Sequence, residues 1–127
     1  MTPMTPREIL TGTRSLLSDP RKWTTGWFAK CEAGIAREAT DEKAVCWCVA
    51  GGIQRVSDGR PAAYFEALRG FIRANAIRLP SYEDGAEDGR DWLEDMHNAI
   101  GGFNDSIDHT GILAALDKAI AAEAANV

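Results

Sequence analysis

The sequence predicts one mainly α domain of the α+β class, with about five helices around a central apolar helix and a small β-hairpin. A length of 127 residues suits a single compact domain. Apolar residues recur at helical spacing in most segments, whereas one segment in the N-terminal third alternates with a period of two. We therefore expect one domain over residues 1–127, with frayed ends at 1–4 and 122–127.

The first predicted helix follows a short N-terminal segment. Thr5-Pro6-Arg7-Glu8 has the form of a capping box, with proline at the first helical position. Apolar residues at helical spacing then give this helix one buried stripe, and Asp19-Pro20 ends it.

A β-hairpin is predicted between Trp23 and Thr40. Residues 27–32 alternate with the two-residue period typical of a strand. Glu32-Ala33-Gly34 can then turn the chain into a second strand at Ile35 to Ala39. Because isolated two-stranded ribbons are marginally stable, we expect this hairpin to pack on helices.

The centre of the predicted fold is a helix from about Thr40 to Val56. Residues 40–42, a threonine and two acids, are typical of a helix N-terminus. Residues 44–50 are apolar around nearly the full helical circumference, which is the pattern of a helix surrounded by other elements. Gly51-Gly52 would weaken the helix, so we expect another backbone to approach closely there.

Three further helices are predicted in the C-terminal half. Asp58-Gly59-Arg60-Pro61 is a turn that places proline at the start of the third helix, whose buried face begins at Phe65. A fourth helix runs from about Gly89 until Gly101-Gly102 stops it. A polar loop over 103–108 follows, and Thr110 can cap the last helix.

Cysteine usage and apolar run lengths indicate a cytoplasmic protein. The first ten residues carry two prolines and mixed charge, unlike a secretory signal. The apolar run from Ala44 to Ala50 is far shorter than the roughly 20 residues that span a bilayer, so we expect no membrane segment. Three cysteines, Cys31, Cys46 and Cys48, suit neither a disulfide framework nor a zinc ribbon and are expected to be reduced.

The negative charge of the chain is concentrated in one stretch, residues 83–95, which we call the acidic segment. It holds seven acids against one base, whereas the rest of the chain carries 12 acids and 13 bases. The acids are Glu83, Asp84, Glu87, Asp88, Asp91, Glu94 and Asp95. Such clustering is either a solvated face or a surface that binds a basic protein partner. Direct nucleic-acid binding is not expected, because no basic stripe with interleaved aromatic residues occurs.

Four features in order resemble domain-of-unknown-function family 6197, a group of small bacterial and phage proteins. They are Trp23-Thr24-Thr25-Gly26, the apolar run with Trp47-Cys48, Asn104-Asp105 in the predicted loop, and the closing amphipathic helix. The resemblance extends from about Ile9 to Ala122, with Phe103 where members typically have tryptophan. It implies a prokaryotic or phage setting and no particular activity.

Residues 104–109 hold the densest set of polar groups suited to acid/base chemistry or metal binding. They are Asn104, Asp105, Asp108 and His109, and His97 on the preceding helix can complete such a site. The alternative to a functional role is a structural one, since Asn and Asp stabilise turns and Asp108 or Thr110 can cap the last helix.

The remaining candidates are thiols and aromatic residues. Cys46 and Cys48 are two residues apart on the predicted helix, so their side chains point about 200° apart and cannot bind one metal ion together. We expect both to be small buried residues of the core. Trp23, Trp27 and Phe28 either cap the core or form an aromatic interaction surface. We expect no metal site and no cofactor.

Together these observations favour a non-catalytic binding protein, encoded by a phage or mobile element, whose acidic segment engages a basic protein partner. Mimicry of nucleic-acid charge is the sharpest version of this hypothesis. The alternative is a small hydrolase or metal-dependent enzyme that uses the 104–109 loop.

Overall fold

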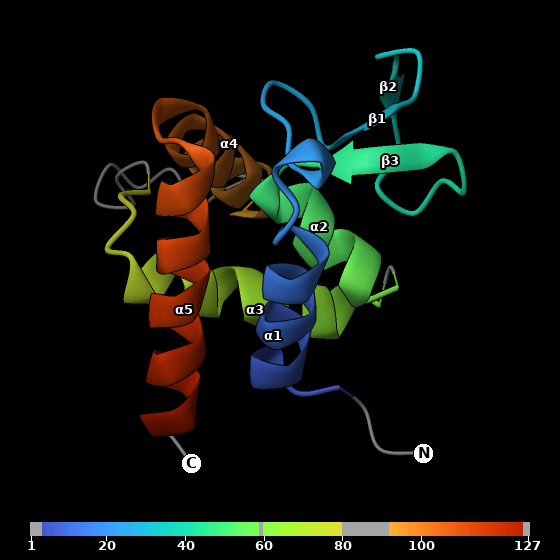
Figure 1. Ribbon diagram of the computed structural model, residues 1–127. Coiled ribbons are helices and arrows are strands. Elements are labelled where there is room, and N and C mark those ends of the chain that lie inside the picture. The colour runs from blue at the N-terminus through green and yellow to red at the C-terminus, as the bar shows by residue number, and fades with distance from the viewer. Residues whose placement is uncertain (1–3, 59, 80–91, 126–127) are drawn as a thin grey trace.

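The computed structural model describes residues 4–58, 60–79 and 92–125 (Figure 1). Within these ranges the chain forms five α-helices, one 3₁₀ turn and a three-stranded sheet, so the predicted mainly α, α+β class is confirmed. The elements are α1 (Pro6–Leu16), η1 (Pro20–Lys22), β1 (Ala29–Cys31), β2 (Ala36–Arg37), β3 (Ala44–Trp47), α2 (Val49–Val56), α3 (Pro61–Ala74), α4 (Trp92–Ser106) and α5 (His109–Ala125).

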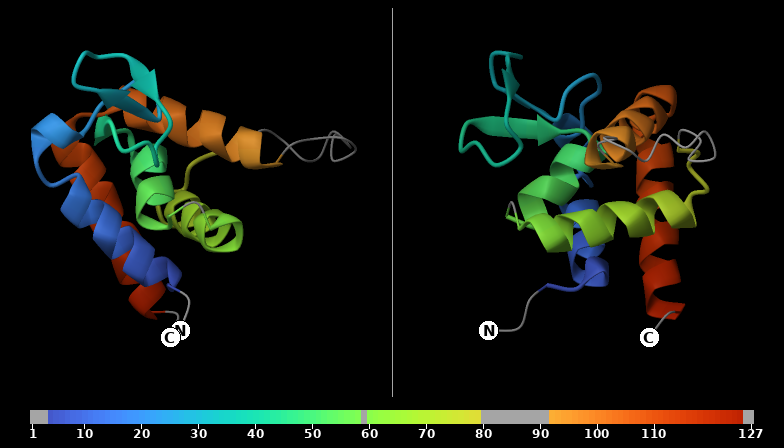
Figure 2. Two further views of the ribbon diagram at one scale, coloured as in Figure 1. Left: turned by 90° about the vertical axis from the view of Figure 1, so that its right-hand side faces the viewer. Right: turned by 180° about the vertical axis from the view of Figure 1, so that it is seen from behind.

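Helix α1 begins as its sequence predicts. The Thr5 hydroxyl accepts a hydrogen bond from the backbone N–H of Glu8, and the Glu8 carboxylate accepts one from Thr5 N–H, so the capping box is formed. Its residues Ile9 and Leu10 are buried, and α5 lies side by side with α1 (Figure 2). Among the described helices, none is long and apolar enough to cross a membrane.

The predicted hairpin is confirmed and is part of a larger sheet. Strands β1 and β2 pair antiparallel, with Ala29 opposite Arg37. A third strand, β3, pairs antiparallel with the other edge of β1, giving the order β2-β1-β3. The sheet lies on the side of the molecule away from α5 (Figures 1 and 2).

The predicted central helix from Thr40 to Val56 is wrong in its first half. Residues 44–47 form strand β3, and α2 begins only at Val49, with Cys48 as its N-cap. A continuous apolar run has no period, so it does not distinguish a buried strand from a buried helix, and pairing with β1 decides the conformation. Cys46 therefore lies on a strand and Cys48 at a helix start, rather than both on one helix.

Helix α2 is nevertheless the apolar centre of the fold. Residues 49–53 are buried, and the helix contacts α1, α3, α4 and β3. A Cβ atom on Gly51 would lie 1.9 Å from the Phe28 carbonyl oxygen, so the predicted close backbone approach at this glycine pair is confirmed. The predicted start of the third helix at Pro61 is also confirmed, whereas Gly59 in the predicted turn lies outside the described residues.

The predicted end of the fourth helix at Gly101-Gly102 is wrong, because α4 continues to Ser106. Its buried residues Met96, Ile100 and Asn104 lie four residues apart and form one face, which continues through the glycines. Packing of this face outweighs the weak helix propensity of glycine. Most of the predicted 103–108 loop is therefore helical, and the predicted start at Gly89 lies outside the described residues.

Candidate functional site: a pocket beside helix α4

A pocket of about 440 Å³ lies between the loop that precedes β1, the start of α2 and the second half of α4. We call it the α4 pocket. Its volume is within the range typical of small-ligand sites. It is lined by Gly26, Trp27, Phe28, Cys48, Ala50, His97, Asn98, Gly101, Gly102 and Asp105.

Asn104 does not line the α4 pocket but joins the segments that form its walls. Its side chain is fully buried, and Oδ1 accepts hydrogen bonds from Trp23 Nε1 at 2.8 Å and Val49 N at 3.0 Å. Its Nδ2 donates to the Thr24 carbonyl at 3.1 Å and to Asp105 Oδ1 at 3.2 Å. One amide thus joins the loop, α2 and α4, and serves as a structural tether.

Asp105 stands on the exposed side of the same turn. Its Oδ1 accepts a hydrogen bond from Gly26 N at 3.1 Å as well as the one from Asn104. Gly26 adopts a positive φ of 86°, which lets the loop turn its amide toward α4. The two motifs Trp23-to-Gly26 and Asn104-Asp105, distant in sequence, therefore meet at the pocket.

Gly101 and Gly102 form a part of the pocket wall that has no side chains. A Cβ atom on either residue would come within 4 Å of no described atom beyond its chain neighbours and the backbone of its own helix turns. Glycine within a helix costs about 1 kcal/mol relative to alanine, and here no described contact requires it. The effect of the two glycines in the folded chain is to keep this space open.

Two aromatic residues border the pocket from the loop. Trp27 is 60% exposed, the largest exposed fraction among the described large apolar side chains. Phe28 is half-buried and contacts the His97 ring edge-on, with centroids 4.8 Å apart. Trp23, the third aromatic candidate, is tied to Asn104 and does not line the pocket.

Cys48 and His97 are the chemically versatile residues of the pocket. Burial raises the pKa of Cys48 to about 11, so its thiol is neutral, and the sulfur accepts a hydrogen bond from Gly51 N. His97 Nε2 shares a hydrogen bond with the Tyr64 hydroxyl, whose pKa burial also raises. A neutral thiol that caps a helix is a poor nucleophile.

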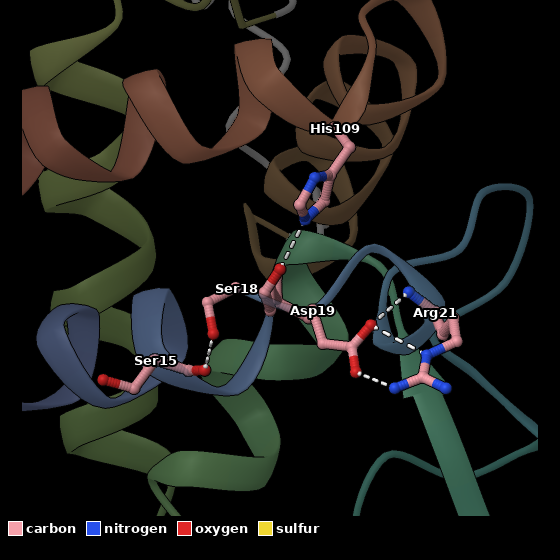
Figure 3. Close-up of polar contacts among 6 residues, drawn as sticks. Ser15, Ser18, Asp19, Arg21 and His109 are labelled. Carbon is pink, nitrogen blue, oxygen red and sulfur yellow. Dashed lines mark hydrogen bonds and ion pairs between the residues drawn. The ribbon is translucent and has the colours of Figure 1, made fainter.

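The other members of the 104–109 set serve separate structural contacts. Asp108 Oδ1 accepts from Gly111 N and caps α5, so Asp108 rather than Thr110 is the cap. His109 Nε2 donates to the Leu17 carbonyl at 2.6 Å, joining α5 to the end of α1 (Figure 3). No group of three or more metal-ligating side chains occurs within the described ranges.

The same close-up shows an ion pair between Asp19 and Arg21. Asp19 accepts two hydrogen bonds from the Arg21 guanidinium and one from Arg21 N (Figure 3). The Arg21 side chain holds the pKa of Asp19 down to about 2. Asp19 caps the 3₁₀ turn η1 by accepting from Arg21 N, and neither residue lines the α4 pocket.

The acidic segment is described only in part. Glu94 and Asp95 lie in the first turn of α4. Glu83, Asp84, Glu87, Asp88 and Asp91 lie outside the described residues.

Sequence reasoning missed the α4 pocket, although it named five of its lining residues as candidates: Trp27, Phe28, Cys48, His97 and Asp105. The available signal was the position of Gly101-Gly102 between Ile100 and Asn104, which lie on one helical face with Met96. We interpreted the glycine pair as a helix end, whereas it marks a bare helix surface.

The fold and pocket define a small, mainly α domain of the α+β class in which distant motifs form a side pocket. The sequence model of a family of unknown function, DUF6197, matches residues 1–122. The chain belongs to this family. No curated protein and no solved structure gives a match, so function is argued from the pocket itself.

Proposed function

We propose that this protein is a non-catalytic binding protein that engages a basic protein partner through the α4 pocket. The observation that carries the proposal is the bare wall at Gly101 and Gly102, where no described side chain uses the space. An exposed Trp27 at the rim adds the kind of aromatic group that dominates binding energy at interfaces.

The charge of the chain supports a basic partner. The acidic segment carries seven of the 19 acids and leads directly into α4, the helix that forms one pocket wall. Concentrated negative charge speeds encounter with a positively charged surface. We propose a prokaryotic or phage setting and a cytoplasmic location, which its three free cysteines support. In this setting the protein acts as an accessory factor that mimics nucleic-acid charge.

Catalysis by residues 104–109 is less well supported. Asn104 is consumed by four hydrogen bonds, Asp108 caps α5 and His109 binds a backbone carbonyl. These contacts leave Asp105 as the member of the set that lines the α4 pocket.

The proposal is tested by capture of the partner from an extract of the source organism on immobilised wild type and Gly102→Leu. Leucine has a good helix propensity and fills the space above the helix, so we expect at least tenfold less of one basic protein on the variant. Ala121→Leu adds similar bulk to the exposed face of α5 and is the matched control, which should capture as wild type does.

The contribution of charge is tested with the triple variant Asp88→Asn/Asp91→Asn/Asp95→Asn. We expect capture to be lost while the circular dichroism spectrum and the unfolding midpoint stay unchanged.

For the pocket variant, equal recovery of the same protein on wild type and Gly102→Leu would contradict the role of the pocket.

A further inference from the structure

We propose, building on the partner-binding function above, that the α4 pocket holds the guanidinium group of an arginine side chain supplied by the partner. Charge, aromatic surface and shape at the pocket support this choice independently.

The charge argument starts from Asp105. Its carboxylate is the only Asp or Glu side chain among the described lining residues, and no Lys or Arg stands beside it there. Both hydrogen bonds that it receives within the described structure go to Oδ1, from Gly26 N and Asn104 Nδ2. The second oxygen, Oδ2, is thus available to pair with a cation, and a guanidinium is the cation that best matches carboxylate geometry.

The aromatic argument concerns the rim. Trp27 and Phe28 line the same pocket as Asp105, so a cation bound at Asp105 has aromatic side chains within the same pocket. Planar guanidinium groups bind to aromatic faces more often than ammonium groups do, and tryptophan is the strongest ring partner.

The shape argument concerns the two glycines. Arginine has a long methylene stem that needs apolar contact along its length. Gly101 and Gly102 expose helix backbone without side chains, and Phe28 and Ala50 supply apolar surface on the facing wall. A stem laid across these glycines reaches Asp105, which is one helical turn further along α4.

An anion is the competing occupant, because the N-terminus of α2 also borders the pocket and helix N-termini attract anions. The N–H of Val49 is already bound by Asn104 Oδ1, and that of Gly51 by the Cys48 sulfur. Two of the first α2 amides are therefore occupied from within the fold, and Asp105 would repel an anion.

The experiment is an NMR titration of the ¹⁵N-labelled full chain with N-acetyl-L-arginine N-methylamide. We expect weak saturable binding, with a Kd of about 1–10 mM, and shifts centred on the amides of Gly26, Gly101 and Gly102 and the indole of Trp27. The matched ligand is the citrulline analogue, which has nearly the same shape without the charge and should bind at least tenfold more weakly. Inorganic phosphate, the anionic probe, should not shift these resonances.

Variants assign the charge contact to one carboxylate. Asp105→Asn keeps an acceptor for Gly26 N and should reduce binding of the arginine probe at least tenfold. Asp117→Asn, at an exposed aspartate on α5, should bind as wild type does.

The outcomes separate this inference from the proposed function. Equal shifts with the arginine and citrulline probes, or saturable phosphate binding, would overturn the guanidinium assignment. Absence of any shift from the arginine probe in the wild type would also overturn it. If Gly102→Leu still loses the partner in those cases, the pocket remains the binding site and only its occupant is wrong.

Discussion

Asn104 uses its side-chain amide fully inside the protein, since its oxygen accepts two hydrogen bonds and its nitrogen donates two. A buried amide with this arrangement fixes the three segments that it joins, because each lost partner would leave a buried polar group unsatisfied. The residue therefore shapes the α4 pocket without lining it.

Asn104→Asp is expected to lower the free energy of unfolding by at least about 2 kcal/mol, measured by urea denaturation. The carboxylate keeps the two acceptor contacts but loses both donors and lies beside Asp105 with like charge. Asn98→Asp makes the same chemical change at an exposed position of α4 and should cost no more than about 0.5 kcal/mol. Equal losses from both variants would refute the tether.

The three thiols are expected to differ in reactivity. Hydrogen bonds from Ile35 N and the Arg37 side chain lower the pKa of Cys31, whereas burial raises that of Cys48 to about 11. Iodoacetamide at pH 8 should therefore alkylate Cys31 first and Cys48 only after unfolding, as peptide mass spectrometry would show. At pH 9 the Cys48 thiol is still below its pKa of about 11 and its side chain is buried, so it should be labelled much more slowly than Cys31. Early labelling of Cys48 would mean that the pocket wall opens.

At the scale of elements, two glycine pairs that look alike in the sequence have opposite roles. Gly51-Gly52 in α2 meets other parts of the chain, with the Phe28 carbonyl on Gly51 and the side chains of Thr13 and Leu17 on Gly52. A Cβ atom on Gly101 or Gly102 in α4 would come within 4 Å of no described atom beyond its chain neighbours and its own helix backbone. The first pair is needed for packing, and the second keeps a surface open.

Gly51→Ala should cost about 3 kcal/mol or more, because the new Cβ would lie 1.9 Å from a backbone oxygen that cannot move aside. Gly102→Ala should be neutral or stabilise the protein by up to about 1 kcal/mol, because alanine is the better helix former. Urea denaturation of the two variants measures both effects. A marked loss of stability in Gly102→Ala would mean that the fold itself requires the open surface.

The sequence was sufficient for elements with local signals and insufficient where long-range pairing decides. The capping box at Thr5, the hairpin turn at Glu32 to Gly34 and the proline start of α3 are local, and all are as predicted. Strand β3 was predicted as helix, because its apolar run carries no period and its partner strand lies 16 residues away at Lys30 and Cys46.

The same reasoning explains why the pocket was not predicted. Its walls come from residues 26–28, 48–50 and 97–105, which meet only after α2 and α4 have packed. Trp27, Phe28 and Asp105 were singled out for their chemistry, but no spacing in the sequence links them. Long-range hydrogen bonds such as Gly26 N to Asp105 Oδ1 create the site.

At the scale of the whole molecule, the fold divides into a helical body and a side that carries the sheet and the α4 pocket. Helices α1, α3 and α5 pack against one another and carry much of the core. The small sheet and α4 lie on the other side (Figures 1 and 2). The α4 pocket is lined there by the loop that precedes β1, the start of α2 and the second half of α4. A net charge of −5 adds long-range attraction for a basic partner, which salt should weaken.

The most direct test of the account is calorimetric titration of the captured basic partner into wild type, Gly102→Leu and Ala121→Leu. The account predicts a Kd at least tenfold higher for Gly102→Leu, with Ala121→Leu indistinguishable from wild type and all three chains equally folded. An unchanged Kd for a folded Gly102→Leu protein would contradict it.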